Sequence, residues 1–469
     1  MKRILIKNLH EHLEKTVLIQ GWVHVARNQG KVAFFDLRDR SGKVQGVVFG
    51  KPEVLEVAET LKQEWVVEIA GIVHERPEKM VNKDTENGDI EIEITKITVI
   101  NEAETPPFSL TDDTLGIDEE ARLKYRYLDL RTDRMQRNIR IRSEFVRKCR
   151  DFLFGKDFVE IETPLLTEST PEGSRDFVVP SRHNPGKFYA LPQSPQQYKQ
   201  LLMAAGFERY VQIARAVRDE DLRADRGYEH TQIDIEMSFV NQKDVMDIVE
   251  EMIISSVESL GFIVKEKPFP RITYKESMEK YGADKFDMRS EEDKKNGILA
   301  YAWVIDFPFF EKTDSGKWTF THNPFSMPKE EHIEWLMKGE NIDQILTTQY
   351  DLVCNGFEAG GGSIRSHKAE ILEAVYKVMG NTEEETKEKI GHMLQALKHG
   401  VPPHGGIALG VERNVMNLTD EQYLREVQAF PMTRRGKTSV MDAPKPLTVE
   451  QLIELGLSVT EKDNETETD

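Results

Sequence analysis

The amino-acid sequence predicts an α+β protein with more than one domain. A small N-terminal β-barrel is followed by a larger domain whose mixed, mainly antiparallel sheet is flanked by helices. Two observations predict this arrangement. Five short apolar or alternating runs fill residues 1–105, and beyond them strand-like and helix-like segments follow each other irregularly instead of in a regular βαβ order. The length of 469 residues suffices for two or three domains with separate cores.

The first domain has the pattern of an OB-fold barrel. Its five strand-like runs lie at 17–25, 32–39, 44–49, 65–75 and 89–100. Between the third and fourth runs, Val54, Val57 and Leu61 repeat at helical spacing. Five strands with one helix at this place are typical of the OB fold, which often binds oligonucleotides. A small barrel without a ligand is the alternative.

The remaining domain boundaries follow from composition. The paired prolines and polar residues of "NEAETPPFSLTDD" predict a hinge, which we assign to residues 106–130. Residues 131–457 then form the large domain, which begins with a long amphipathic helix near 132–156. The acidic residues 458–469 contain few large apolar side chains and are expected to be frayed.

Charge and cysteine content exclude several classes of protein. With 63 basic and 82 acidic side chains the formal net charge is −19, which argues against coating nucleic acid by bulk charge. Cys149 and Cys354 lie far apart without CxxC spacing, so we interpret both as reduced packing residues. Neither an export signal nor an apolar run of about 18 residues is found. We therefore expect a cytoplasmic protein.

The stretch "RDEDLRADRGYEHTQIDIEMSF", residues 218–239, combines a charged loop with a strand. Its arginines alternate with carboxylates, a combination suited to bidentate phosphate binding. In the strand, apolar residues alternate with Asp234 and Glu236, so the two carboxylates share one face. A solvated face is the ordinary interpretation of such alternation.

A second acidic pair lies in "YDLVCNGFE". Asp351 and Glu358 are seven residues apart on a probable strand, so a bulge or turn between them is needed if both are to reach one ion. Paired carboxylates suit Mg²⁺ bound with nucleotide phosphates, whereas two unrelated surface carboxylates are the alternative. The glycine clusters "EAGGGSIRSH" and "HGGIALGVER" each join close backbone approach to an arginine.

Together these segments resemble the class II aminoacyl-tRNA synthetases, and within them the aspartyl-tRNA synthetases of bacterial type. The resemblance covers nearly the whole chain. "FVEIETPLLTESTPEGSRDF" is similar to motif 1 with the loop that closes over the amino acid, the arginine-rich stretch to motif 2, and "GGIALGVER" to motif 3. The usual inserted domain between motifs 2 and 3 is missing.

The resemblance implies an aspartate-binding pocket. Lys199 and Arg365 would grip the side-chain carboxylate of aspartate. Two cations favour a carboxylate over the amide of asparagine, whose NH₂ would face donors without an acceptor. The other implied aspartate-binding residues are Glu172, Gln196, Asp234 and His322.

The resemblance also implies an ATP site, in which Arg218 and Arg413 are catalytic. Arg218 would contact the α-phosphate, where charge grows as the aspartate carboxylate attacks, and Arg413 the γ-phosphate. Asp351 and Glu358 would hold Mg²⁺ with the substrate ATP. The implied ATP-binding set is Arg218, Asp219, Glu220, His230, Glu358, Gly410, Val411, Glu412 and Arg413.

In the barrel, the resemblance implies recognition of a tRNA anticodon. Phe34 would stack on one base, while Arg27, Gln45 and Glu91 would read its neighbours. Strand alternation sends one of Phe34 and Phe35 into the core, and the sequence does not decide which. Motif 1 implies a homodimer.

The implied activity is ATP-dependent aspartate–tRNA ligation, with tRNA(Asp) as acceptor; whether tRNA(Asn) is also charged is left open. The alternatives are an asparaginyl enzyme, which Lys199 disfavours, and an RNA-binding protein that has lost catalysis. Three residues depart from the usual pattern, namely His230, Asn323 and Glu412.

Overall fold

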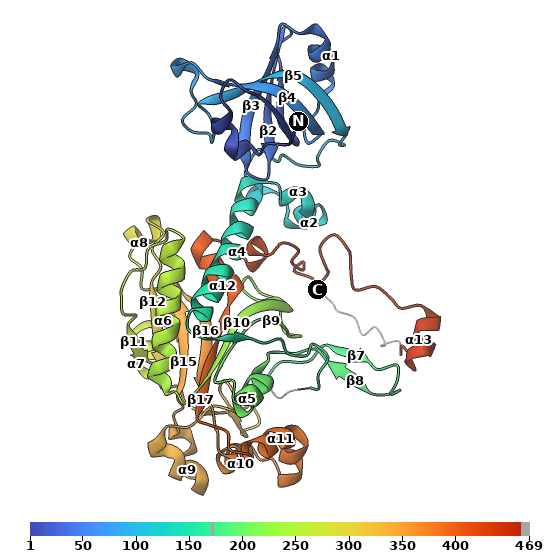
Figure 1. Ribbon diagram of the computed structural model, residues 1–469. Helices are drawn as coiled ribbons and strands as arrows, with labels where there is room; N and C mark the ends of the chain where they lie inside the picture. The colour runs from blue at the N-terminus through green and yellow to red at the C-terminus, as the bar shows by residue number, and fades with distance from the viewer. Residues whose placement is uncertain (170–172, 461–469) are drawn as a thin grey trace. The chain divides into compact units, whose positions relative to one another are not determined.

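Figure 1 shows the protein as a computed structural model, which describes residues 1–169 and 173–460. The chain folds into two compact units, Met1–Arg134 and Met135–Asp469. Each unit has a hydrophobic core of its own. The expected hinge at 106–130 lies within the first unit, and most of the expected frayed tail, residues 461–469, lies outside the described residues.

The first unit contains a closed five-stranded barrel with the strand order β1-β2-β3-β5-β4. Strands β3 and β5 are parallel and the other neighbours are antiparallel. One helix, α1 (Pro52–Thr60), separates the third and fourth strands. The predicted OB-fold barrel is confirmed. Its strands are β1 (Thr16–Asn28), β2 (Val32–Asp39), β3 (Gly42–Phe49), β4 (Val66–Glu75) and β5 (Ile90–Asn101).

Alternation along β2 decides which phenylalanine belongs to the core. Ala33, Phe35 and Leu37 are buried, and Phe35 is 1 % exposed. Phe34 lies between them in sequence and is partly exposed, because successive side chains of a strand point to opposite faces. Phe34 is therefore free of the core and lies on the outer face of the barrel.

The second unit is built on an eight-stranded sheet with the order β11-β12-β15-β16-β17-β10-β9-β6. Two edge pairs, β11 with β12 and β6 with β9, are parallel, and the five inner pairs are antiparallel. The predicted mixed, mainly antiparallel sheet is confirmed. Its strands are β6 (Val159–Glu160), β9 (Arg209–Val217), β10 (Glu229–Ser238), β11 (Arg271–Thr273), β12 (Tyr301–Ile305), β15 (Gln349–Cys354), β16 (Phe357–Ile364) and β17 (His404–Gly410).

Three helices cover the apolar face of this sheet: α4 (Asp133–Phe154), α6 (Gln242–Ser259) and α12 (Val411–Thr419) (Figure 1). Phe145, Val249 and Val415, one from each helix, share a buried cluster with Ile233 and Leu352 of the sheet. Burying this face fixes the pleat of the strands and leaves their alternate side chains on the opposite, polar face.

The remaining elements lie around the sheet or, for α2 and α3, at the end of the first unit. The further helices are α2 (Glu119–Lys124), α3 (Arg126–Asp129), α5 (Gln196–Ala204), α7 (Tyr274–Tyr281), α8 (Glu291–Lys295), α9 (Ile333–Lys338), α10 (Ala369–Val378), α11 (Glu383–Leu397) and α13 (Val449–Leu455). The short strands β7 (Val178–Pro180), β8 (Phe188–Ala190), β13 (Phe310–Lys312) and β14 (Trp318–Phe320) form two hairpins. In the described part of the chain, no helix has the length and apolar character that crossing a membrane requires.

Candidate functional site

The polar face of the sheet carries two buried carboxylates from β10. Asp234 and Glu236 are 1 % and 0 % exposed, so the solvated face considered from the sequence is wrong for this strand. Burying a carboxylate is costly unless it is paired and hydrogen-bonded. Both residues meet cations from other elements.

Lys199 and Arg365 converge on these carboxylates. The Lys199 Nζ, on α5, donates to Asp234 Oδ1 at 2.6 Å and lies 3.3 Å from Glu236 Oε2. The Arg365 Nε, just beyond β16, donates to Glu236 Oε1 at 3.0 Å, and its Nη2 donates to Oε2 at 3.2 Å. Ser363 Oγ accepts from Nη1 of the same guanidinium at 2.9 Å. Glu236, for which the sequence suggests no role, therefore joins the two predicted cations.

The formal charges of the two cations and two carboxylates in this cluster sum to zero, and all four side chains are buried. Burial favours the neutral form of Glu236, but Arg365 and Lys199 outweigh it and hold the pKa of Glu236 below its ordinary value. Burial dominates at Asp234 and raises its pKa although Lys199 opposes the shift. The cluster thus holds fixed positive and negative charges side by side. A ligand that carries both a negative and a positive group could bind to it.

Several buried polar atoms beside the cluster have no hydrogen-bond partner within the described protein. They include Asp234 Oδ2, Gln196 Nε2 and Gln232 Oε1. An unsatisfied buried polar atom costs on the order of 1–3 kcal/mol, so several in one place mark a site for a polar ligand. Glu172, also expected here, lies outside the described residues.

The acidic pair of β15 and β16 lies on the same face. The register of the two strands shifts between Leu352 and Val353, and a turn separates the strands. This irregularity lets both carboxylates reach one place: a Cβ built on Gly361 would lie 3.0 Å from Asp351 Oδ1 and 3.5 Å from Glu358 Oε1. Glycine at this position leaves the space open.

The charges of this pair favour a cation. Burial and the charge of Glu358 raise the pKa of Asp351 well above its ordinary value. Burial would also raise the pKa of Glu358, but Arg413 and Lys285 outweigh it and lower the pKa to about 2. Within the described residues, no three or more His, Cys, Asp or Glu side chains form a metal-binding group. The pair fits an ion that takes its other ligands from a bound phosphate.

His322 lies beside the acidic pair, with Cε1 3.4 Å from the same Cβ position on Gly361. Its side chain is exposed, yet the crowding of protein atoms around it lowers its pKa to about 4, and Arg365, Arg218 and Lys285 add to the shift. The ring is therefore neutral at pH 7 and can accept or donate one hydrogen bond.

Arg413, in the first turn of α12, lies between the motif 2 loop and β16. Its Nη2 is 3.1 Å from Asp225 Oδ2 and its Nη1 is 3.6 Å from Glu358 Oε2. Arg218 follows β9, and its Nε donates to the carbonyl oxygen of Gln193 at 3.3 Å. The alternating charges suggested that the acids of the motif 2 loop hold the arginines of the same loop. In the structure Asp225 of this loop pairs with Arg413 of motif 3, and Glu220 lies 3.8 Å from Arg226.

The other residues of the expected ATP-binding set are spread more widely. Burial, with Arg218 and Arg413 adding to it, lowers the pKa of His230 to about 3, so this ring is neutral. Asp219 lies 3.5 Å from Arg175 of a neighbouring loop, and Glu220 lies 3.8 Å from Arg226 of its own loop. Gly410 precedes α12, and the Val411 side chain is buried in the core.

Glu412 contacts a different part of the molecule from Arg413. Its carboxylate accepts hydrogen bonds from Arg142 Nη2 at 2.8 Å, from the Thr231 amide at 3.0 Å and from Gln428 Nε2 at 3.2 Å. The protein itself therefore satisfies this carboxylate, which joins motif 3 to α4 and to motif 2.

In the first unit, the four expected anticodon-binding residues share the outer face of the barrel. Arg27 lies opposite Phe34 on neighbouring strands, and Gln45 lies opposite Glu91. Arg27 Nη2 donates to Asp36 Oδ1 at 2.8 Å, and Gln45 Nε2 donates to Glu91 Oε2 at 3.1 Å. An exposed aromatic ring among polar groups is the arrangement by which OB folds bind unpaired bases.

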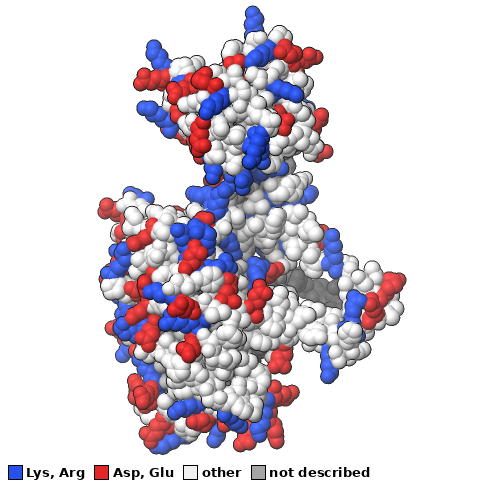
Figure 2. Space-filling model, in the orientation of Figure 1, with Lys and Arg blue, Asp and Glu red and all other residues white. Residues whose placement is uncertain are grey.

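The surface around these sites is mixed in charge. On the face of each unit that Figure 2 shows, acidic and basic side chains are interspersed. This agrees with the net charge of −19.

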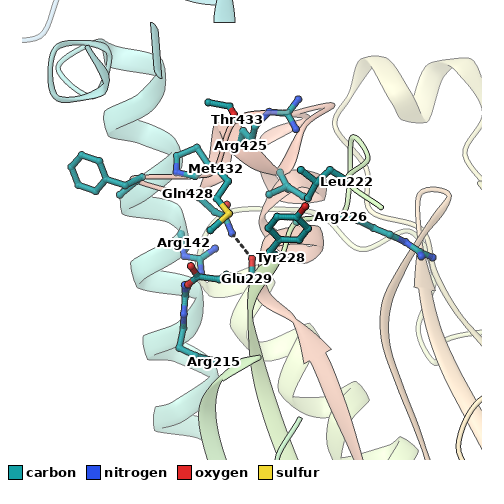
Figure 3. Close-up of a pocket in the computed structure, with 15 residues that line it drawn as sticks. Arg142, Arg215, Leu222, Arg226, Tyr228, Glu229, Arg425, Gln428, Met432 and Thr433 are labelled. Atoms are coloured by element: carbon teal, nitrogen blue, oxygen red, sulfur yellow. Dashed lines mark hydrogen bonds and ion pairs between the residues drawn. The ribbon is translucent and has the colours of Figure 1, made fainter. Parts of the chain in front are cut away.

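A cavity of about 260 Å³ is lined by α4, β9, the motif 2 loop and residues between 424 and 433 (Figure 3). Arginines from α4, β9 and the loop line it, and Gln428 Nε2 donates to the Glu229 carbonyl oxygen at its edge. Arg142, Arg215 and Arg226 pair with Glu412, Glu229 and Glu220. The cavity contains none of the residues expected to bind substrate.

The chain matches two described families. Residues 118–434 match "tRNA synthetases class II (D, K and N)", and residues 17–100 match "OB-fold nucleic acid binding domain". The chain is 38 % identical to the aspartate–tRNA ligase of Staphylococcus saprophyticus, over 95 % of this chain and 97 % of that protein. It is 39 % identical to the aspartate–tRNA(Asp/Asn) ligase of Rubrobacter xylanophilus, over 94 % of each.

Solved structures share the fold. The aspartyl-tRNA synthetase of Entamoeba histolytica has a TM-score of 0.73 at 23 % identity, covering 92 % of this chain and 91 % of that chain. The asparaginyl-tRNA synthetase of Pyrococcus horikoshii complexed with asparaginyl-adenylate has a TM-score of 0.73 at 22 % identity, covering 92 % and 98 %. By its match to the family over most of its length and by its identity to curated relatives, the chain belongs to the class II tRNA synthetases (D, K and N).

Proposed function

We propose that the protein is an ATP-dependent aspartate–tRNA ligase. It activates L-aspartate with ATP to aspartyl-adenylate and pyrophosphate, and then transfers the aspartyl group to the 3′ end of tRNA(Asp). The observation that carries the proposal is the convergence of Lys199 and Arg365 on Glu236, beside the free oxygen of Asp234. The relatives named aspartate–tRNA ligase support the same substrate.

The cluster complements the groups of aspartate. The side-chain carboxylate would bind Lys199 and Arg365, and the α-ammonium would bind Asp234 Oδ2. Gln196, with its unpaired Nε2, would accompany Asp234 at the amino-acid end, and His322 would complete the pocket. Asparagine would place its NH₂ against two cationic donors, so the cluster disfavours it.

The ATP site would lie where Arg218, Arg413 and the acidic pair meet the amino-acid pocket. Arg218 would stabilise charge on the α-phosphate as the aspartate carboxylate attacks it, and Arg413 would bind the γ-phosphate. Asp351 and Glu358 would hold Mg²⁺, which supplies countercharge to the phosphates. Neutral His230 would face the adenine. No protein nucleophile is needed, because the substrate carboxylate attacks.

The barrel would bind the anticodon through Phe34, Arg27, Gln45 and Glu91. We also propose a cytoplasmic homodimer assembled through motif 1. Two exposed leucines of this motif, Leu165 and Leu166, support the interface, since large apolar side chains that are exposed together favour association.

Amino-acid-dependent exchange of pyrophosphate into ATP tests the function. We expect exchange with aspartate and none with asparagine. Exchange with asparagine alone would assign the asparaginyl activity, and exchange with neither would indicate an RNA-binding protein without catalysis. Charging of purified tRNA(Asp) and tRNA(Asn) then decides between a tRNA(Asp) enzyme and one with the dual acceptor range named for the Rubrobacter relative.

A further inference from the structure

Lys285 contacts the acidic pair although neither the sequence nor the motifs suggest a role for it. It lies between α7 and α8, and its Nζ is 3.1 Å from Glu358 Oε2 and 4.0 Å from Asp284 Oδ2. Its side chain is 36 % exposed, so it faces the open part of the site.

Glu358 divides its two oxygens between different neighbours. Oε1 lies near the Cβ position of Gly361, beside Asp351 Oδ1. Oε2 is approached by Lys285 at 3.1 Å and by Arg413 Nη1 at 3.6 Å. One side of the carboxylate thus faces the proposed ion position, and the other side holds two cations next to each other.

Two adjacent cations place more positive charge beside this oxygen than the single negative charge of the carboxylate can neutralise. Arg413 is also held by Asp225 at 3.1 Å, whereas Lys285 has a flexible stem and a compact charge that can move to a phosphate. A divalent ion on Asp351 and Glu358 would repel Lys285 and weaken its attraction to Glu358. The phosphate chain of ATP, which carries more negative charge than the single carboxylate of Asp284 at 4.0 Å, could then receive the ammonium.

We propose that Lys285 is a further ATP-binding residue, whose ammonium binds the β- and γ-phosphates together with Arg413. The inference rests on the proposed function. In adenylate formation the bond between the α-phosphorus and the bridging oxygen breaks, and pyrophosphate leaves with that electron pair. Lys285 would stabilise the charge that develops on this leaving group.

The test compares ATP with AMP, which lacks the β- and γ-phosphates. Binding of each nucleotide, measured by calorimetry in magnesium buffer, is compared for the wild type, Lys285→Gln and Lys285→Arg. We expect Lys285→Gln to weaken ATP binding about tenfold or more, since one charge-assisted hydrogen bond is lost. AMP binding and the KM for aspartate stay unchanged, and Lys285→Arg recovers most of the ATP affinity.

Lys275→Gln is the matched control, because Lys275 lies on nearby α7 and is 86 % exposed. Equal ATP affinity of Lys285→Gln and wild type would overturn the inference, and so would equal weakening of ATP and AMP, which indicates a structural role. Failure of the wild type to exchange pyrophosphate with aspartate is a separate result, which overturns the proposed function itself.

Discussion

Lys199 places a buried ammonium between Asp234 and Glu236, and its loss has a direct consequence for substrate binding. We predict that Lys199→Met lowers kcat/KM for aspartate in pyrophosphate exchange by about a hundredfold, because a charge-assisted contact of on the order of 1.5–3 kcal/mol is lost. Stability also falls, since Asp234 loses its cation.

Lys156→Met is the control, because Lys156 pairs with Glu251 on the surface, far in sequence from the polar cluster. Circular dichroism establishes that both variants are folded before the kinetics are compared. Unchanged kinetics in folded Lys199→Met would contradict the role assigned to the lysine.

Glu64 in the barrel gives a pH-dependent prediction. Burial would raise the pKa of Glu64, but His24, Arg38 and Arg131 together lower it to about 2, from 4.5. A depressed pKa contributes stability that is present above pH 4.5 and is lost as the pH falls towards 2. We expect a contribution of about 3 kcal/mol at pH 7.

Calorimetry of the wild type and Glu64→Gln from pH 7 to pH 3 measures this contribution. The stability difference between them should be largest at neutral pH and shrink below pH 4.5. A difference that is constant over this range would show that Glu64 does not titrate in this way.

At the scale of single residues, the sequence predicted which face of a strand a side chain lies on better than it predicted which other side chains it contacts. Alternation placed Asp234 and Glu236 on one face, and the structure agrees. It could not predict that Arg365, 129 residues away, would reach Glu236, because periodicity is local and contacts across a sheet depend on register. The same limit left Phe34 and Phe35 undecided until the barrel fixed which face is inside.

Among the elements, β16 shows why glycine-rich segments are difficult to predict. From the sequence, residues 359–363 belong to a glycine cluster that allows close backbone approach to a ligand, whereas in the structure they form part of an inner strand of the sheet. A Cβ on Gly362 would lie 2.1 Å from the Gly406 carbonyl oxygen, so this glycine permits close approach of β17. Such a requirement comes from the neighbouring strand and leaves no local pattern. The strands with apolar alternation, by contrast, were predicted within a few residues.

Two adjacent glycines of β16 should therefore respond differently to alanine. Gly361→Ala adds a methyl group 3.0 Å from Asp351 Oδ1, in the space proposed for the ion, so we expect a folded protein that needs about tenfold more Mg²⁺ for exchange. Gly362→Ala forces β16 and β17 apart and should cost more than about 3 kcal/mol.

Urea unfolding and magnesium titration of the exchange reaction separate the two effects. Equal destabilisation by both substitutions would contradict this interpretation, in which Gly361 leaves space for the ion and Gly362 allows β16 and β17 to pair closely.

For the whole molecule, we expect the first unit to bind the tRNA anticodon and the second unit to activate the amino acid. Phe34→Ala should weaken tRNA binding by about tenfold, since base stacking on an aromatic ring is worth on the order of 1–3 kcal/mol. Pyrophosphate exchange, which needs no tRNA, should be unchanged. Phe35→Ala is the contrasting variant, because emptying a core position costs about 3–5 kcal/mol and should unfold the barrel.

Aminoacylation at varied tRNA concentration, with exchange measured in parallel, tests this division. A loss of exchange in Phe34→Ala would show that the outer face of the barrel acts on the catalytic unit and not through tRNA alone.

The size of the chain also bears on its organisation. Its alignment with the Staphylococcus relative runs over 575 positions, 106 more than the 469 residues present here, so that relative carries at least this many residues in segments that this chain lacks. The second unit nevertheless contains a continuous eight-stranded sheet. The resemblance to bacterial-type synthetases implied that an insertion between motifs 2 and 3 is missing here, and an alignment longer than the chain agrees with missing segments.

The buried carboxylate of Glu64 determines where the chain can be truncated to produce the barrel alone. Arg131 Nη1 donates to its Oε2 at 2.7 Å, and the Ala103 carbonyl oxygen accepts from Trp65 Nε1 at 3.1 Å. A gene fragment ending at residue 105 would keep the second contact and lose the first. An expressed barrel intended for tRNA-binding work should therefore extend through Arg134, so that the truncation does not remove a counter-ion from the interior.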